Sequence, residues 1–248
     1  MTEQKQGNSA VIDRINLISQ FIKTFGKDRI EVVLGDREFI GQEWVDWLKN
    51  ERIPYNLRIR EIREYVADSN GEMVHAYKLF QRLRPGKTRM LGLRRIGLSR
   101  PFYTNVSGLC GKNGTVVALM HSADIHNPCE TYRKRWEIEV LFKAFKTGGF
   151  NLESTHIVEP ERLNTLLGIL ALACCIAYRC GIMLINLTKP VLKKHGYKAL
   201  SVIRYGLDVL LNFIQIKTHK PRGKLKKIMS RFKRRLMSYF RGLRTFVM

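Results

Sequence analysis

Acidic residues are absent from two long stretches of the sequence. The segment from Lys78 to Arg100 contains eight Lys or Arg residues and no Asp or Glu, and the segment from Lys217 to Arg244 contains twelve and again no acid. The whole chain of 248 residues has a formal net charge of +23. A chain this cationic favours a polyanionic partner, of which nucleic acid is the commonest and an anionic membrane surface the competitor.

The cysteines form no CxxC pair of the kind that binds zinc or carries out redox chemistry. Their number is odd, and Cys174, Cys175 and Cys180 fall within one apolar segment, apart from Cys110 and Cys129. This distribution argues against a disulfide framework and against a structural zinc site. We predict buried, reduced thiols in a cytosolic protein.

The amino-terminal sequence MTEQKQGNSAVIDRIN lacks the apolar core of a signal peptide. A later segment, Leu163 to Leu187, is long enough to span a bilayer. It contains Asn164 and Arg179, and an arginine near the bilayer centre is costly. We therefore predict a buried core helix that ends near Gly181 and no membrane partner. A membrane-associated basic protein is the minority interpretation.

The first part of the chain has the periodicity of an α/β layer. Apolar positions from Ala10 to Phe25 recur at helical spacing, and the apolar run Ile30 to Leu34 predicts a buried strand closed by Gly35 and Asp36. GQEWVDWLKNERI then predicts an amphipathic helix, and YNLRIREI alternates like a half-exposed strand. Helix, strand, helix and strand in succession are typical of an α/β sheet.

Between Asp68 and His121 the pattern changes to short segments separated by turn residues. HAYKLF, RMLGLRRIGL and TVVALMHS are candidate strands, and Asn113-Gly114 is the strongest turn signal among them. We predict a small, basic, β-rich insertion that is separate from the α/β layer.

From Pro128 onward the pattern is helical. Thr131 or Asn127 is a candidate N-cap for the first helix, Gly148-Gly149 would close that helix, and Pro160 would begin the next.

After Pro190 the sequence predicts a further pair of helices and a basic tail. In the tail, apolar residues recur every three or four positions between Leu225 and Phe240, which indicates an amphipathic helix packed on the core or on DNA. The expected divisions of the chain are residues 1–67, 68–123, 124–190 and 191–248.

One expected helix, in ETYRKRWEIEVLFKAFKTGG, places four polar side chains along a narrow line. At about 100° per residue, the residues that fall within about 60° of one another are Tyr132, Arg135, Glu139 and Lys146. An apolar stripe beside them consists of Ile138, Leu141, Phe142 and Phe145. The plain explanation is a solvated helix face with one i, i+4 ion pair. A phosphate-backbone contact explains all four, with the carboxylate holding a metal.

The pattern Y-x2-R-x3-E-x6-K resembles the hallmark of one branch of bacterial insertion-sequence DDE transposases, and this chain carries it at Tyr132, Arg135, Glu139 and Lys146. Other stretches are similar to the same family: VVLGDREFIG around Asp36, ESTHIVEPERL after the expected helix, and HGYKALSVIRYGLD further on. The resemblance covers most of the chain, from about Gly7 to about Phe213.

The resemblance implies an α/β, RNase H-like fold with a β-rich insertion and a helical, basic carboxyl-terminal region. It assigns Asp36 as the second Asp and Glu139 as the Glu of the DDE triad. It also assigns Tyr132, Arg135 and Lys146 as DNA phosphate contacts at the transposon end. Without the resemblance, Asp36 is better explained as a turn or helix-capping acid.

The implied chemistry needs oxygen ligands. In-line cleavage of a phosphodiester uses two divalent ions, which activate the attacking oxygen and stabilise the leaving one. Mg²⁺ and Mn²⁺ prefer carboxylates to thiols or imidazoles. The resemblance therefore implies two such ions in an intact enzyme, with Asp36 and Glu139 among their ligands.

The first Asp of the implied triad has no counterpart in the sequence. Asp13 lies in an expected helix and Asp28 in the turn before the strand of Asp36, so neither follows an apolar strand. GNSAVIDRINLI resembles what the family has after its third strand. We expect a truncated transposase, either a decayed copy or the second half of a split reading frame, whose missing acid an upstream polypeptide supplies.

The sequence thus predicts a transposase catalytic-domain protein of the bacterial cytoplasm that cleaves and transfers strands of double-stranded DNA at transposon ends and target sites. We expect this activity to be impaired in the truncated chain, and a homodimer on DNA is a further expected partner. The alternative is a non-catalytic, basic nucleic-acid-binding protein that retains the fold.

Overall fold

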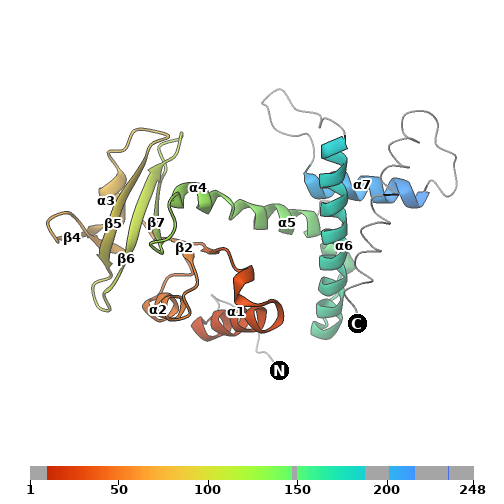
Figure 1. The fold of residues 1–248 in the computed structure, drawn as a ribbon, viewed down its shortest axis with the longest axis horizontal. Helices are drawn as coiled ribbons and strands as arrows, with labels where there is room; N and C mark the ends of the chain where they lie inside the picture. The colour runs from red at the N-terminus through yellow and green to blue at the C-terminus, as the bar shows by residue number, and fades with distance from the viewer. Residues whose placement is uncertain (1–9, 147–149, 188–200, 216–233, 235–248) are drawn as a thin grey trace. The chain divides into compact units, whose positions relative to one another are not determined.

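The computed structural model describes residues 10–146, 150–187, 201–215 and 234 (Figure 1). The chain divides into two compact units, Met1–Trp136 and Glu137–Met248. A seven-stranded sheet forms the centre of the first unit, and the described residues of the second are mostly helical.

The first helix, α1, spans Val11–Phe25, as predicted from its apolar spacing. Ile15, Ile18 and Ile22 recur at helical intervals and pack against the core of the first unit. The carboxylate of Asp13 accepts a hydrogen bond of 3.1 Å from the backbone N–H of Ala10. Asp13 therefore serves the amino-terminal turn of a helix, whose first N–H groups lack intrahelical partners.

A strand–helix–strand unit follows the short 3₁₀ helix η1 (Lys27–Arg29) and confirms the predicted α/β succession. Strand β1 spans Val33–Gly35, helix α2 spans Gln42–Asn50, and strand β2 spans Tyr55–Arg58. The two strands pair in parallel. The intervening helix permits this because it brings the chain back to the end of the sheet at which β1 begins. Helix α2 buries Trp44, Val45 and Leu48, as its amphipathic pattern predicts.

Strand β2 is buried and not half-exposed, so that expectation from the sequence was wrong. Tyr55, Asn56 and Leu57 are all buried because both faces of β2 are covered. Asn56 binds the start of α4, and Tyr55 and Leu57 belong to the core cluster that includes Trp44 of α2. The alternating pattern that suggested exposure comes largely from residues beyond Arg58, which form a loop.

The remaining strands extend the same sheet. They are β3 (Tyr65–Ala67), β4 (Met73–His75), β5 (Thr88–Ile96), β6 (Phe102–Cys110) and β7 (Val116–His121). The strand order is β1-β2-β7-β6-β5-β3-β4, and every pair except β1–β2 is antiparallel. Because β7 pairs directly with β2, this region continues the α/β layer, and the expectation that it is separate was wrong.

Most of HAYKLF is a helix and not a strand. Helix α3 spans Ala76–Phe80 and buries Ala76 and Phe80, which are four residues apart and so lie on one helical face. The ring of Phe80 lies so close to β6 that a Cβ atom on Gly108 would come within 2.6 Å of it. The Asn113-Gly114 turn is confirmed: it joins β6 to β7, with Gly114 at a φ of 79°.

Helices cover both faces of this sheet. Helix α4 (Pro128–Arg133) begins after the N-cap residue Asn127, one of the two predicted candidates. Its Cys129 lies against Ser107 on β6, whereas Phe80 of α3 packs on the neighbouring Gly108. Successive strand residues point to opposite faces, so α3 and α4 lie on opposite sides of the sheet.

The second unit contains α5 (Trp136–Lys146, whose first residue belongs to the first unit), the 3₁₀ helix η2 (Leu152–Thr155), α6 (Pro160–Leu187) and α7 (Val202–Gln215). Helix α6 begins at Pro160 as predicted but continues beyond Gly181. A Cβ atom on Gly206 would lie 1.7 Å from the carbonyl oxygen of Ala177, and one on Gly181 would lie 2.0 Å from that of Val202. Gly181 therefore permits a close crossing of α6 and α7 instead of ending α6.

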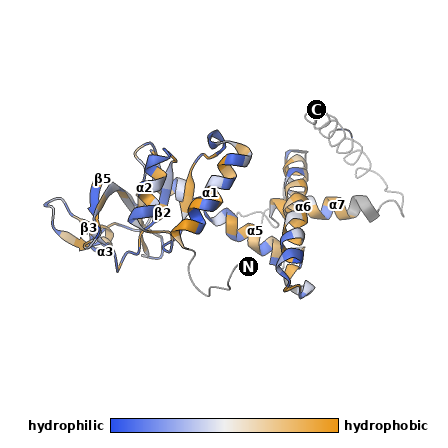
Figure 2. Cartoon of the chain, turned by 90° about the horizontal axis from the view of Figure 1, so that it is seen from below, coloured by the Kyte–Doolittle hydropathy of each residue, from blue (hydrophilic) through white to orange (hydrophobic). Residues whose placement is uncertain are grey.

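Helix α6 is only partly buried, so the prediction of a buried core helix was wrong. Figure 2 shows hydrophobic residues, in orange, along much of this helix. Cys174, Ala177 and Cys180 lie on its buried side, while Ile169 and Leu172 are exposed. By length and composition alone, Pro160–Asn186 could cross a membrane, a test that core helices of soluble proteins also pass.

All five cysteines are free thiols, and Cys175 is exposed while the other four are buried. The predicted Gly148-Gly149 helix end, the first of the two helices after Pro190 and the amphipathic basic tail lie outside the described residues.

Candidate active site

Asp36 lies where a functional carboxylate of an α/β sheet is expected. It directly follows β1 and is half-buried. Gly35 is level with Leu57 in the parallel β1–β2 pair, so the next residues, Asp36 and Arg58, emerge side by side at the carboxyl ends of the two strands. Ligands of open α/β sheets bind at the carboxyl ends of the strands.

Helix α4 is fastened to the same strand pair. Asn56, fully buried in β2, donates a hydrogen bond of 2.7 Å from Nδ2 to the carbonyl oxygen of Pro128, the first residue of α4. Tyr132 follows Pro128 by one helical turn. This bond therefore fixes the helix segment that carries Tyr132 above the strand ends.

Tyr132, the first residue of the sequence signature, is electrostatically coupled to Asp36. Burial, and to a smaller extent the nearby charge of Asp36, raise the pKa of the Tyr132 phenol to about 12, against the opposing effect of the guanidinium groups of Arg135 and Arg58. The structure thus brings Asp36, Tyr132, Arg135 and Arg58 together in one unit. At neutral pH the phenol keeps its proton and can donate a hydrogen bond to an anion.

Arg135 lies against two aromatic rings. Its guanidinium carbon is 5.7 Å from the centroid of the Tyr132 ring and 5.8 Å from that of Trp136. These distances fall within the range of cation–π attraction. The planar group is therefore held beside the phenol instead of extending freely into solvent.

The sequence predicted one uninterrupted helix for the four signature residues, and this prediction was wrong. Helix α4 ends at Arg133, Lys134 and Arg135 form a turn, and α5 begins at Trp136. The N–H groups of Lys134 and Arg135 bond to carbonyl oxygens three residues earlier. Lys134 also forms a 2.9 Å ion pair with Glu31, near β1. No Gly or Pro marks this break, so no local sequence signal predicts it.

Glu139 and Lys146 lie on α5 in the second unit, and both side chains are exposed. Being seven residues apart, they share one face of the helix, separated by roughly 20°. Asp36, Tyr132 and Arg135 belong to the first unit. A metal shared by Asp36 and Glu139 therefore stays a prediction.

The apolar stripe of α5 only partly faces a core. Leu141 and Phe145 pack with the buried Ala144 into the apolar cluster of the second unit. Ile138 and Phe142 are exposed, contrary to the expectation from the sequence.

Two functional candidates near Asp36 were missed by reasoning from the sequence. Arg58 Nε lies 2.7 Å from Glu61 Oε1, and both side chains are largely buried. The alternation of YNLRIREI suggested two solvent-exposed charges. The sequence signal that could have identified this pair was the spacing of an Arg at the end of a buried strand and a Glu three residues later.

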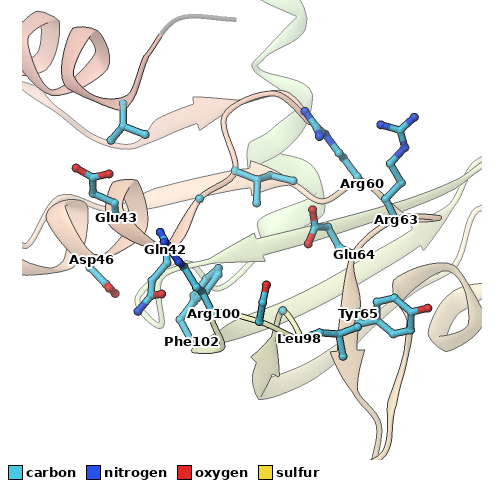
Figure 3. A pocket seen from close by; sticks show the side chains of 15 residues that line it. Gln42, Glu43, Asp46, Arg60, Arg63, Glu64, Tyr65, Leu98, Arg100 and Phe102 are labelled. Carbon is cyan, nitrogen blue, oxygen red and sulfur yellow. The ribbon is translucent and has the colours of Figure 1, made fainter.

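Asp36 opens onto a cleft of about 600 Å³ that is rich in arginine. Its other lining residues are Arg37, Glu38, Phe39, Arg60, Glu61, Ile62 and Arg63. A second cleft of about 750 Å³ shares Arg60 and Arg63 with the first (Figure 3). Arg60 is anchored, because its Nε donates a hydrogen bond of 3.0 Å to the carbonyl oxygen of Arg37.

A complete metal site is not present within the described residues. No three His, Cys, Asp or Glu side chains among them are grouped so as to hold an ion. Asp36 is a suitable oxygen ligand for Mg²⁺, but the neighbouring Glu61 carboxylate is engaged by Arg58. By itself, the first unit is better equipped to bind a phosphate than to hold a metal.

Comparison with known families agrees with the sequence signature. The family model described as the transposase DDE domain matches residues 5–176, a range that includes Asp36 and the four signature residues. No curated protein matches the chain. The mixed α/β fold is consistent with the predicted RNase H-like class. Because the match covers more than half of the sequence, the chain belongs to the DDE-domain transposase family.

Proposed function

We propose that the chain is the catalytic part of a bacterial insertion-sequence transposase of the Tyr-Arg-Glu-Lys branch. Its reaction is metal-dependent cleavage and transfer of DNA strands at the ends of its own element. Family membership supports the general class of nuclease and transesterase chemistry. The complete signature, from Tyr132 to Lys146, supports the assignment to this branch.

One observation supports the proposal: Asp36, Arg58 and Arg135 all lie near the phenol of Tyr132. A DNA phosphate beside Asp36 would meet the neutral phenol of Tyr132 as a hydrogen-bond donor. Arg58 and Arg135 would add charged donors, which bind phosphate more strongly than neutral ones. The three donors would thus orient a phosphodiester next to a carboxylate suited to a divalent ion.

Asp36 and Glu139 are the proposed ligands for Mg²⁺ or Mn²⁺. When bound, such ions activate the attacking oxygen and stabilise the leaving oxygen. The part of this chain is to hold the two carboxylates and to orient the phosphate through Tyr132 and Arg135. Lys146, on the face of α5 that also carries Glu139, would contact a further phosphate of the same DNA.

Double-stranded DNA is the proposed partner, both as transposon end and as target. The net charge of +23 supports such a partner. A second copy of the chain on DNA and an upstream polypeptide that supplies the first Asp complete the proposed assembly. The proposed location is the bacterial cytoplasm, where the DNA lies.

The second candidate is a basic DNA-binding protein that retains the fold without catalysis. It is favoured by the lack of a ready group of three metal ligands among the described residues. The two candidates differ in their response to Glu139→Gln, which removes a negative ligand but little volume.

Mobilisation of a marked element in cells, with any upstream reading frame supplied, tests the proposal. If the proposal is correct, Glu139→Gln abolishes mobilisation, and Glu137→Gln, the control on the same helix, retains it. Binding of the element's ends by wild type without any mobilisation would favour the non-catalytic candidate. Undiminished mobilisation by Glu139→Gln would show that Glu139 is not a metal ligand.

A further inference from the structure

The loop between β2 and β3 is fastened to three neighbouring parts of the first unit. The N–H of Ile59 donates to the carbonyl oxygen of Ala118 on β7 at 2.8 Å. The N–H of Tyr77, in the first turn of α3, donates to the carbonyl oxygen of Glu61 at 2.8 Å. The side chain of Arg60 binds the loop that follows Asp36. Glu61 therefore lies in a rigidly held segment next to the candidate site.

The side chain of Glu61 is also held. The residue is 7% exposed, and its Oε1 accepts a hydrogen bond of 2.7 Å from Nε of Arg58. Carboxylates are rarely this buried unless they are paired. The pair is therefore a specific arrangement and not a chance contact between two surface charges.

Stability alone does not explain this pair. Removing two charges from water costs about as much as their attraction returns, so a well-packed apolar pair often stabilises a fold equally well. What the ion pair adds is direction, because the guanidinium group is planar and its N–H donors have fixed geometry. With Nε bound to Glu61, the orientation of the terminal amino groups of Arg58 is fixed as well.

The position of Arg58 makes this direction relevant to the site. Arg58 and Asn56 are two residues apart on β2, so they point to the same face of the sheet. On that face Asn56 binds the start of α4, the helix that carries Tyr132. Arg58 directly follows Leu57, which pairs with Gly35, the residue before Asp36. The charge of Arg58 also acts on the phenol of Tyr132. A guanidinium fixed here faces the space between Asp36 and Tyr132.

We propose that Glu61 is a positioning residue: it holds the guanidinium of Arg58 so that its terminal N–H groups bind a DNA phosphate beside Asp36 and Tyr132. Glu61 itself touches neither DNA nor metal. The identity of the bound anion rests on the proposed function, but the orientation of Arg58 by Glu61 does not. The two parts can therefore be tested separately.

The orientation is tested on the full chain without DNA. The Nε–H proton of Arg58, assigned by ¹⁵N NMR through its loss in Arg58→Lys, should exchange slowly with water in wild type. Glu61→Ala should speed this exchange at least tenfold, because the proton loses its buried, charged acceptor. Glu61→Gln, which keeps an oxygen acceptor, should restore most of the protection. Equal exchange in wild type and Glu61→Ala would overturn the proposal.

Glu64→Ala is the matched control. Glu64 lies in the same loop and loses the same charge on substitution, but its side chain lines the second cleft and not the Arg58 contact. It should leave the exchange of the Arg58 proton unchanged. A similar acceleration in Glu64→Ala would show that the loop as a whole had loosened, and the specific role of Glu61 would be lost.

The consequence for DNA is tested by a double-mutant cycle on the affinity for a labelled, blunt-ended DNA duplex. Arg58→Ala and Glu61→Ala should each weaken binding by about tenfold, the usual effect of losing a charged hydrogen bond. The double variant should be no weaker than Arg58→Ala, since Glu61 acts through Arg58. If the loss of affinity in the double variant equals the product of the losses in the two single variants, the proposal is overturned. If the wild-type protein does not bind the DNA duplex, the proposed function is overturned. The orientation of Arg58 by Glu61 is then decided by the proton-exchange measurement alone.

Discussion

The phenol of Tyr132 and the carboxylate of Asp36 are close enough for the charge of the acid to disfavour ionisation of the phenol. The two residues are far apart in the sequence and meet because Asn56 of β2 binds the first turn of α4. The coupling joins the first residue of the Tyr-Arg-Glu-Lys signature to the strand end that carries the acid. It is the structural basis for treating them as one site.

Replacing Tyr132 by Phe should weaken DNA binding without unfolding the protein. The substitution keeps the buried ring and its contact with Arg135 but removes the hydroxyl donor. We expect a loss of about tenfold in affinity for a labelled DNA duplex, measured by fluorescence anisotropy. Tyr77→Phe, at an exposed position of α3, serves as the control. Unchanged affinity of Tyr132→Phe would remove the phenol from the phosphate site.

The raised pKa of Tyr132 predicts a loss of stability in alkali. An unfolded Tyr loses its proton near pH 10, whereas burial and Asp36 keep the folded phenol neutral to about pH 12. The free energy of unfolding contributed by this group is therefore fully present below pH 10 and falls as the pH rises from 10 to 12.

Asp36→Asn should lower the pKa of Tyr132, because it removes a negative charge that opposes formation of the phenolate. The titration can be followed by ¹³C NMR of the Tyr132 ring carbon that bears the hydroxyl. Asp46→Asn, a change of equal charge on α2, should leave this pKa unaltered. A Tyr132 pKa that does not fall in Asp36→Asn would contradict the proximity of the two groups.

The crossing of α6 and α7 predicts opposite effects of alanine at two glycines. Gly206→Ala would place a Cβ atom 1.7 Å from the Ala177 carbonyl oxygen, so the helices must separate. We expect a cost of about 3 kcal/mol or more in the free energy of unfolding. Gly168→Ala has open space around its Cβ and should stabilise α6 by about 0.5–1 kcal/mol. Denaturant unfolding followed by circular dichroism measures both, and no loss in Gly206→Ala would contradict the crossing.

The phosphate contact proposed for Lys146 predicts a specific change in the salt dependence of DNA binding. Removing one cationic side chain that binds a DNA phosphate should reduce the slope of log affinity against log salt by about 0.9. Lys146→Gln should show this reduction on duplex DNA. Lys112→Gln, in the β6–β7 turn, should retain the wild-type slope. Equal slopes for wild type and Lys146→Gln would mean that Lys146 contacts no phosphate.

Much of the first unit could be predicted from local sequence patterns. The apolar spacing of α1 and α2 and the Asn113-Gly114 turn are confirmed. The strand before Asp36 is present but covers only Val33–Gly35 of the expected region, and it is half-buried up to Gly35. These features depend on periodicity and turn chemistry within a few residues. The signature itself was visible because four residue types recur at fixed spacing.

The missed features depend on interactions that local patterns do not record. The helix breaks after Arg133, although the surrounding residues are good helix formers. At the break, the backbone N–H groups of Lys134 and Arg135 bond to carbonyl oxygens three residues earlier, and Lys134 forms an ion pair with the distant Glu31. The burial of Asn56 on β2 depends on α4, whose first residue, Pro128, lies 72 positions further along the chain. Glu61 looked like a surface charge for the same reason.

Binding of Mn²⁺ to the DNA-bound chain, measured by electron paramagnetic resonance with any upstream polypeptide present, tests the central claim most directly. If Asp36 and Glu139 hold the same ions, Asp36→Asn and Glu139→Gln should each weaken binding by tenfold or more, and Glu137→Gln should not. The double variant should lose little beyond either single one. Wild-type Mn²⁺ affinity in either single variant would contradict a metal site shared by these two carboxylates.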